Sequence, residues 1–145
     1  MYEVVLDVIK KYEKYDYIMI LQVTNPFRNS KMIDKSIKKL INSEADTLVS
    51  VTKVDDVHPS RMYKMKKKYL KSYDKKKENF NRQDLEKLYH RNGQIYLFKK
   101  ENLIRYKNFY GKKILPIITN KEDTINIDSY FDYVIAKLYY EKKNS

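Results

Sequence analysis

Hydrophobic residues along the chain follow two periods, and their alternation predicts an α/β fold. Residues 2–14 carry apolar side chains at the spacing of one helical face. The run Tyr17–Leu21 is unbroken and apolar, which is typical of a strand covered on both faces. A second amphipathic segment, with Asn29 or Ser30 as N-cap, precedes the β-branched run Thr47–Thr52. This helix–strand–helix–strand order predicts parallel strands joined by right-handed crossovers.

The second half of the chain predicts further strands and helices. Gln94–Phe98 forms an apolar strand, and Glu101–Tyr106 forms a short helix. Lys112–Ile118 is a strand that Pro116 confines to an edge or an end of the sheet. The closing helix is expected to begin at a cap formed by Asp128 or Ser129. Buried stripes are predicted for the second and last helices: Ile33, Ile37, Leu40 and Ile41; Phe131, Val134, Ile135, Leu138 and Tyr139.

Region 55–90 differs from the rest of the chain in its composition. Residues 61–77 contain nine Lys or Arg side chains, with tyrosines between them. Such a stretch can bind phosphates and stack on bases, but lysine stems more often lie over apolar surface in an exposed hairpin. We therefore expect an inserted basic hairpin and loop in residues 55–90 of a single domain that spans residues 1–145.

The composition leaves several classes of protein open and excludes others. The net charge of +12 is compatible with a polyanion partner such as nucleic acid, but the lysine bias of an AT-rich genome is the favoured explanation, and we do not expect a nucleic-acid partner. The absence of cysteine excludes disulfides and thiolate metal sites. No apolar run approaches the roughly 20 residues of a membrane span, and Glu3 and Asp7 are unlike a secretory signal. We expect a cytoplasmic protein.

Polar groups follow the Tyr17–Leu21 strand at its carboxyl end, where open α/β sheets bind their ligands, and this segment is the first of four short motifs. They occur in one order along the chain: QVTNPFR at Gln22–Arg28; ADTLVSV at Ala45–Val51, followed by His58-Pro59; RQDL and NGQIY within Arg82–Tyr96; and INID at Ile125–Asp128. Together these segments resemble the acylneuraminate cytidylyltransferases, the CMP-sialic acid synthetases. The RQ-L…NG-IY segment is the most specific part of the resemblance.

The resemblance implies a Rossmann-like nucleotide-diphospho-sugar transferase fold with a mostly parallel sheet and flanking helices. It also implies a reaction in which CMP passes from CTP to a sialic acid or related nonulosonic acid, with Mg²⁺ as cofactor. Catalysis of such a transfer is mainly positioning and neutralisation of phosphate charge. A homodimer is expected as well.

The same resemblance assigns candidate site residues. The substrate-binding set is Gln22, Arg82, Gln83, Tyr96, Phe109 and Tyr110. The guanidinium of Arg82 suits a sugar carboxylate, and Arg61 falls near a basic position that reaches across a dimer. The metal ligands are Asn126 and Asp128, of which Asp128 is the catalytic residue. Asn126 stands where the family has an aspartate, which weakens the field at a metal ion.

One family motif has no counterpart in residues 1–145. The family begins with a strand and a basic, glycine-containing loop that holds the triphosphate, and nothing here resembles that loop. We therefore expect the chain to be a fragment that does not turn over CTP alone. The alternatives are a non-catalytic basic module that binds nucleic acid or another polyanion, and an inactive truncated remnant.

Overall fold

The computed structural model describes residues 2–12, 14–54 and 56–144. Its contacts divide the chain into two compact units, the first formed by residues 1–52 with 91–145 and the second by residues 53–90. Glu13, inside the first predicted helix, and Asp55, where the insert was expected to begin, lie outside the described residues.

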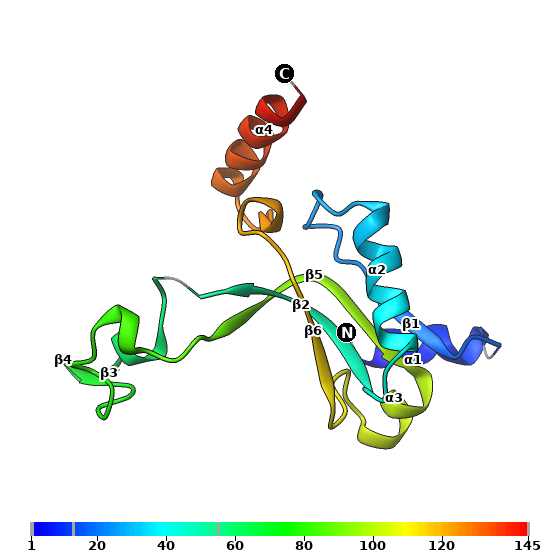
Figure 1. The fold of residues 1–145 in the computed structure, drawn as a ribbon, viewed down its shortest axis with the longest axis horizontal. Helices are drawn as coiled ribbons and strands as arrows, with labels where there is room; N and C mark the ends of the chain where they lie inside the picture. The colour runs from blue at the N-terminus through cyan, green and yellow to red at the C-terminus, as the bar shows by residue number, and fades with distance from the viewer. Residues whose placement is uncertain (1, 13, 55, 145) are drawn as a thin grey trace. The chain divides into compact units, whose positions relative to one another are not determined.

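A four-stranded sheet forms the centre of the first unit (Figure 1). The strand order is β1-β5-β2-β6. β1 and β5 are antiparallel, whereas β2 and β6 are parallel. The elements that contribute to this unit are α1 (Tyr2–Lys11), β1 (Tyr17–Ile20), α2 (Ser30–Ile41), β2 (Thr47–Lys53), β5 (Tyr89–Lys99), α3 (Lys100–Tyr106), β6 (Ile114–Ile118), η3 (Glu122–Thr124) and α4 (Tyr130–Asn144).

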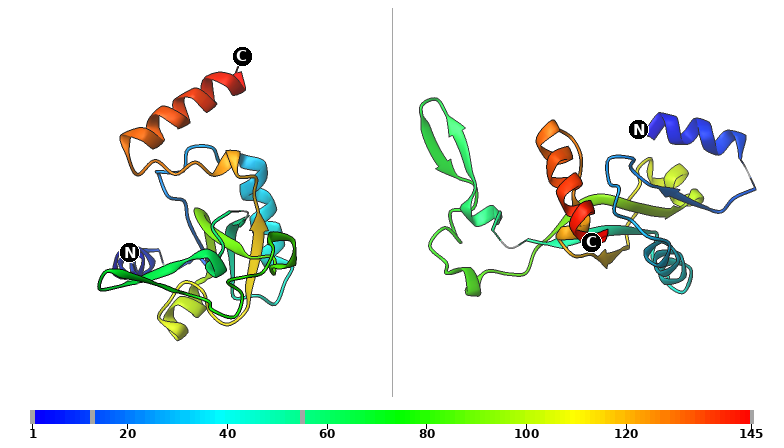
Figure 2. Two further views of the ribbon diagram at one scale, coloured as in Figure 1. Left: turned by 90° about the vertical axis from the view of Figure 1, so that its left-hand side faces the viewer. Right: turned by 90° about the horizontal axis from the view of Figure 1, so that it is seen from above.

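Helices cover both faces of the sheet, and each face has its own apolar cluster. Leu40 of α2 packs with Leu97 of β5 on one face. Ile9 of α1 and Leu103 of α3 pack with Phe98 on the other. Figure 2 shows α1 and α2 on opposite sides of the strands. Successive residues of a strand point to opposite faces, so Leu97 and Phe98 allow β5 to contribute to both clusters. The fold is α/β, as predicted.

Several local predictions are confirmed. Asn29 caps α2, because its Oδ1 accepts a hydrogen bond from the Met32 N–H at 2.9 Å. The short helix α3 begins within one residue of its predicted start. Pro116 lies in β6, which is an edge strand. A proline is tolerated there because the missing N–H leaves no gap inside the sheet.

Two predictions of burial hold only in part for the described residues. β1 is an edge strand whose residues are half-buried or exposed, although Met19 packs against the cluster on one face and Ile18 and Ile20 pack against the cluster on the other. In α2, Leu40 is buried, but Ile37 and Ile41 are exposed. The apolar arc of α2 is wide, and the helix turns Ser36 and Leu40 toward the sheet. Sequence periodicity alone does not choose between overlapping stripes on one helix.

The predicted stripe of α4 is also largely exposed. Phe131 and Leu138 are 71% and 61% exposed, and Ala136 is the buried residue of this helix. Tyr139 and Lys143 both contact the rest of the unit, and Lys143 Nζ lies 3.0 Å from Asp123 Oδ1. The Tyr139 ring meets Phe27 edge-on at 4.9 Å, and its hydroxyl donates to Asp123 Oδ1 at 3.0 Å.

The second unit contains the expected basic hairpin. β3 (Tyr63–Lys66) and β4 (Tyr69–Ser72) are antiparallel, and Lys67 turns between them with a φ of 55°. The 3-10 turns η1 (Pro59–Arg61) and η2 (Arg82–Asp84) lie on either side of the hairpin in sequence. Across the described residues of both units, no helix is long and apolar enough to cross a membrane.

Candidate functional site

The segment after β1 forms a tight turn around the backbone oxygen of Gln22. The Asn25 N–H donates to this oxygen at 3.2 Å, and Arg28 Nη1 donates to it at 2.6 Å. Partial burial lowers the pKa of the Arg28 guanidinium from its ordinary value. The turn therefore holds the Gln22 side chain at the carboxyl end of the strand, where α/β sheets bind ligands.

Gln22 is seated against Gly93 of β5. Gly93 has a φ of +79°, and a Cβ atom there would overlap Gln22 Oε1 and lie 3.4 Å from Asn25 Nδ2. The neighbouring Asn92 anchors the strand, because its Nδ2 donates to Thr52 Oγ1 at 2.8 Å and to Thr119 Oγ1 at 2.7 Å. The Asn-Gly pair thus fixes the backbone and leaves room for the glutamine.

Asn126 joins the segment before α4 to the turn after β1. Its Oδ1 accepts hydrogen bonds from Thr24 Oγ1 at 2.5 Å and from Asn25 Nδ2 at 2.8 Å. Its Nδ2 donates to Asp128 Oδ2. A backbone bond from Ile127 N–H to the Thr24 oxygen, 2.8 Å long, reinforces the junction. Two segments about a hundred residues apart in sequence therefore form one polar cluster.

These bonds decide which residues fit a magnesium ion. Both lone pairs of Asn126 Oδ1 accept hydrogen bonds, so in this arrangement the side chain presents no free oxygen to a metal. Asp128 is exposed and keeps its carboxylate. No group of three or more His, Cys, Asp or Glu side chains that could hold a metal occurs among the described residues. The donor set fits an ion held by one carboxylate and by substrate phosphates.

Ser129, and not Asp128, caps α4. The Ser129 N–H and Oγ donate to Asp132 Oδ2 at 2.8 and 2.7 Å, and the Asp132 N–H donates back to Ser129 Oγ at 3.3 Å. This is the reciprocal arrangement of a capping box. The hydrogen bond from the Ser129 side chain lowers the pKa of Asp132. The carboxylate of Asp128 is therefore not required for the start of the helix.

The three aromatic candidates lie in different surroundings. Tyr96 is half-buried on β5, in register with Ile20 of β1. Phe109 packs in the cluster on the α1 and α3 face, with its ring centroid 5.3 Å from that of Phe98. The Tyr110 ring lies 4.5 Å from the guanidinium of Arg91. All three side chains are half-buried, and only Phe109 packs against one of the two apolar clusters.

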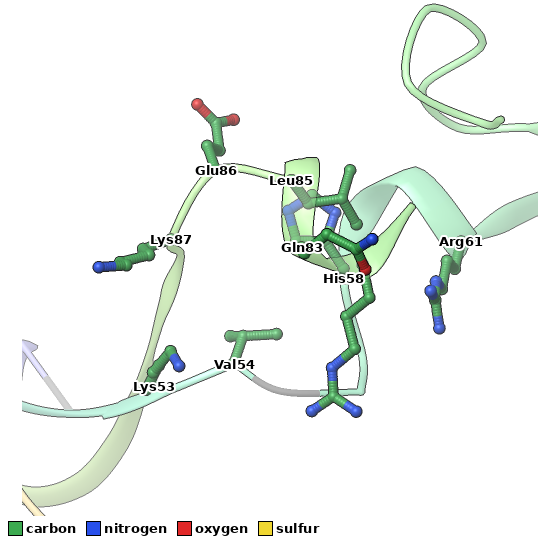
Figure 3. A pocket seen from close by; sticks show the side chains of 9 residues that line it. Lys53, Val54, His58, Arg61, Gln83, Leu85, Glu86 and Lys87 are labelled. Carbon is green, nitrogen blue, oxygen red and sulfur yellow. The ribbon is translucent and has the colours of Figure 1, made fainter. Parts of the chain in front are cut away.

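Arg82 and Gln83 line a pocket within the second unit. The cavity is about 330 Å³ in volume, and Arg82 Nη1 lies 3.2 Å from Asp56 Oδ1. Figure 3 shows Lys53 and Lys87 on one side of this pocket and Arg61 on the other. The pocket is rich in cationic side chains, which suits an anionic ligand.

Asp46 supports the fold in a way that the sequence motif did not reveal. Its Oδ2 accepts from the backbone N–H groups of Lys112 and Lys113 at 2.7 and 2.9 Å. The bond from Lys113 is the main reason that the pKa of Asp46 lies below its usual value. A Cβ on Gly111, where φ is +64°, would lie 2.5 Å from Asp46 Cβ. The signal available in the sequence was an aspartate of the ADTLVSV motif just before a predicted strand, together with the glycine turn at Gly111.

Comparison with known families identifies the chain. A family described as "Cytidylyltransferase" matches residues 2–138. The chain belongs to this cytidylyltransferase family. It is 30% identical over 146 residues to an N-acylneuraminate cytidylyltransferase of Escherichia coli O18:K1:H7 (strain RS218 / NMEC), covering 99% of this chain and 34% of that protein.

Two further similarities support the assignment. A CMP-N,N'-diacetyllegionaminic acid synthase of Legionella pneumophila is 26% identical over 149 residues, covering 92% of this cytidylyltransferase-family chain and 59% of that protein. The solved structure of a 4-diphosphocytidyl-2C-methyl-D-erythritolsynthase from Anaerococcus prevotii DSM 20548 superposes with a TM-score of 0.61 at 14% identity, covering 94% of this chain and 65% of that one. The fold is therefore Rossmann-like. The chain spans about a third of the length of the E. coli relative.

Proposed function

We propose that the protein containing this chain transfers CMP from CTP to a sialic acid or a related nonulosonic acid and releases pyrophosphate. An oxygen on the anomeric carbon of the sugar would attack the α-phosphate. The observation that carries the proposal is the seating of Gln22 over Gly93 at the carboxyl end of β1, beside the Asn126 junction. The names of the E. coli and Legionella relatives support the substrate class.

The residues of the chain take distinct roles in this proposal. The carboxamide of Gln22 would hydrogen-bond the sugar, and Tyr96 and Tyr110 would provide apolar and aromatic walls. Arg82 and Gln83 would bind the sugar through its carboxylate and hydroxyl groups. Phe109 would act indirectly, by packing against Phe98 and so fixing the segment that carries Tyr110. We also propose that the active protein is a homodimer.

Magnesium would be held by Asp128 together with the phosphates of CTP. The ion would neutralise charge on the phosphates during transfer. Asn126 would hold Asp128 in place through its Nδ2 donor rather than ligate the ion.

The decisive measurement is pyrophosphate release with CTP, N-acetylneuraminic acid and Mg²⁺. Residues 1–145 alone should be inactive, since they contain no glycine-containing triphosphate loop. Adding the CTP-binding segment of a family member, by fusion or as a separate chain, should restore CMP-sugar formation. Turnover by residues 1–145 alone would contradict the fragment proposal, and inactivity with every tested segment would contradict the transfer proposal.

The basic hairpin does not favour the alternative of a nucleic-acid-binding module. Two of its tyrosines are already engaged by lysines of the same unit, with Lys64 Nζ 4.9 Å from the Tyr73 ring and Lys68 Nζ 5.4 Å from the Tyr69 ring. Binding of DNA or RNA should be weak and should fall steeply with salt. Tight, sequence-selective binding at physiological salt would favour the module instead.

A further inference from the structure

The two outer edges of the four-stranded sheet differ in how they are protected. β6 forms one edge and has Pro116 at its centre. Thr119, three residues on, donates its N–H to the Val51 oxygen of β2, so Pro116 faces the outer side, where it offers no N–H. The Pro116 oxygen accepts a hydrogen bond from Lys39 Nζ of α2 at 2.7 Å. Proline and lysine at an edge oppose pairing with a further strand, so the β6 edge is closed.

The β1 edge carries no such protection. Tyr17–Ile20 contains neither a charged residue nor a proline, and no described strand other than β5 pairs with it. An unbroken apolar run is typical of an interior strand. Ile18 and Met19 pack against the clusters on opposite faces, yet both remain half-buried. Their burial is incomplete because a neighbouring strand covers one side of β1 only.

The hydrogen bonds at the start of β1 show which backbone groups face outward. The Lys100 N–H donates to the Asp16 oxygen at 2.8 Å, so these two residues form a hydrogen-bonded pair of the antiparallel ladder. Such pairs alternate with pairs that are not hydrogen-bonded. The N–H and C=O groups of Ile18 therefore face β5, whereas those of Tyr17 and Met19 face outward.

The position of Gln22 indicates what covers this edge. Open α/β sheets bind ligands in a crevice at the carboxyl ends of strands, where the strand order reverses. Gln22 follows β1 at that end, but β5 bounds only one side of it. A strand on the outer side of β1 would complete the crevice. A loop lies at the carboxyl end of the strand that it follows, so only a parallel strand brings a triphosphate-binding loop beside Gln22.

We propose that the outer edge of β1 docks the strand that precedes the glycine-containing triphosphate loop, and that this strand pairs with β1 in parallel. The pairing uses the outward backbone groups of Tyr17 and Met19. The choice of occupant rests on the proposed function, whereas the open edge does not. The E. coli relative is long enough to contain such a segment, because the chain spans about a third of it. A second copy of the chain, paired edge to edge, is the competing occupant.

The first test is amide hydrogen exchange, measured by NMR on residues 1–145 with and without the strand-and-loop segment of the E. coli relative. The segment is supplied both as a separate chain and as a fusion. Exchange at Tyr17 and Met19 should slow by about tenfold or more relative to Ile18, which already bonds to β5. The outward amide of Ile118, on the closed β6 edge, should not change relative to Ile18. Unchanged exchange at Tyr17 and Met19 in both forms would overturn the proposal.

The second test compares Tyr17→Pro with Tyr17→Ala. Both variants lose the same ring, but only proline removes the outward N–H, and proline is tolerated at the first residue of an edge strand. Association with the separate segment should be about threefold to tenfold weaker for Tyr17→Pro than for Tyr17→Ala. In the fusion, the Met19 amide should exchange faster in Tyr17→Pro. Equal behaviour of the two variants, with slow exchange at Ile18 showing that β1 still pairs with β5, would overturn the pairing.

The third test is the direction of the added strand. The chain has no cysteine, so Val23→Cys provides a single site for a spin label, and Val23 is 91% exposed after β1. A parallel strand places its following loop near the label, and the label should broaden the NMR signals of that loop. Broadening at the beginning of the added strand instead would show an antiparallel arrangement and overturn the proposal.

The outcomes separate this inference from the proposed transfer reaction. Protection of Tyr17 and Met19 without CMP-sugar formation supports the docking surface and contradicts the transfer reaction alone. CMP-sugar formation without that protection contradicts the docking surface alone. If the two amides of residues 1–145 become protected as the concentration of this chain rises, with no segment present, the occupant is a second copy and the proposal is overturned.

Discussion

The carboxamide of Gln22 occupies the space that a side chain on Gly93 would fill. The two residues lie in different sequence motifs, one after β1 and one within β5. The contact is possible because Gly93 has no Cβ and adopts a φ of +79°. This pair explains why an Asn-Gly sequence lies inside a long strand. The glycine serves both the backbone conformation and the position of the glutamine.

Gly93→Ala should destabilise the first unit. The left-handed conformation alone costs about 1–2 kcal/mol for a residue with a Cβ, and the displaced Gln22 adds to that cost. Urea unfolding of the variant and of the parent chain measures the sum. In a Gln22→Ala background the same glycine substitution should cost less, because no carboxamide remains to be displaced. An equal cost in both backgrounds would show that the two residues are not in contact.

Asn126→Asp should change the response of the chain to magnesium. The variant keeps an oxygen that accepts from Thr24 and Asn25, but it replaces the N–H donor to Asp128 with a second negative charge. Like charges repel, so the melting temperature should fall without Mg²⁺. Two carboxylates one residue apart bind Mg²⁺ more strongly than one, so added Mg²⁺ should raise the melting temperature more than it does for the parent. The control is a monovalent salt at equal ionic strength. An equal Mg²⁺ response in both proteins would contradict this prediction.

Asp128→Asn and Ser129→Ala should have opposite profiles. Ser129 caps α4, and loss of such a cap costs about 1 kcal/mol. Asp128 is exposed and does not cap the helix, so its substitution should change stability by less than about 0.5 kcal/mol. In the completed enzyme, Asp128→Asn should remove most activity and Ser129→Ala should retain it. Thermal melts and pyrophosphate release on both variants provide the comparison. If Asp128→Asn destabilises the chain and leaves the rate unchanged, the metal assignment is wrong.

Asp46 should make the stability of the chain depend on pH. The backbone N–H of Lys113, and then that of Lys112, lower the pKa of Asp46 in the folded state. A lowered pKa means that the stabilisation is fully present above the unfolded value of about 3.9 and is lost as the pH falls through the folded value. Asp46→Asn should therefore be less stable at neutral pH and should show a smaller loss of stability on acidification.

Urea unfolding of both proteins across a pH series tests this, and the difference between the two curves isolates Asp46 from the other carboxylates. Parallel curves at every pH would contradict the assignment.

Local signals in the sequence determined much of the secondary structure. Asn29 as a cap, the basic hairpin, the short helix before Tyr106 and Pro116 in an edge strand all depend on a few neighbouring residues. Each of these features is decided by backbone hydrogen bonds or backbone dihedral preferences close by in the chain. The family, too, could be inferred from the order of four short segments, which the match over residues 2–138 confirms.

Only the tertiary structure decided how these elements meet. Strand β5 lies between β1 and β2. This order could not be predicted, because pairing between strands far apart in sequence leaves no local pattern. The buried side of α2 was set by its docking on the sheet. Asn126 looked like a metal ligand in sequence, but contacts with Thr24 and Asn25 use both lone pairs of its oxygen. A residue's type fixes which bonds it can form, whereas its partners across the fold determine which bonds it does form.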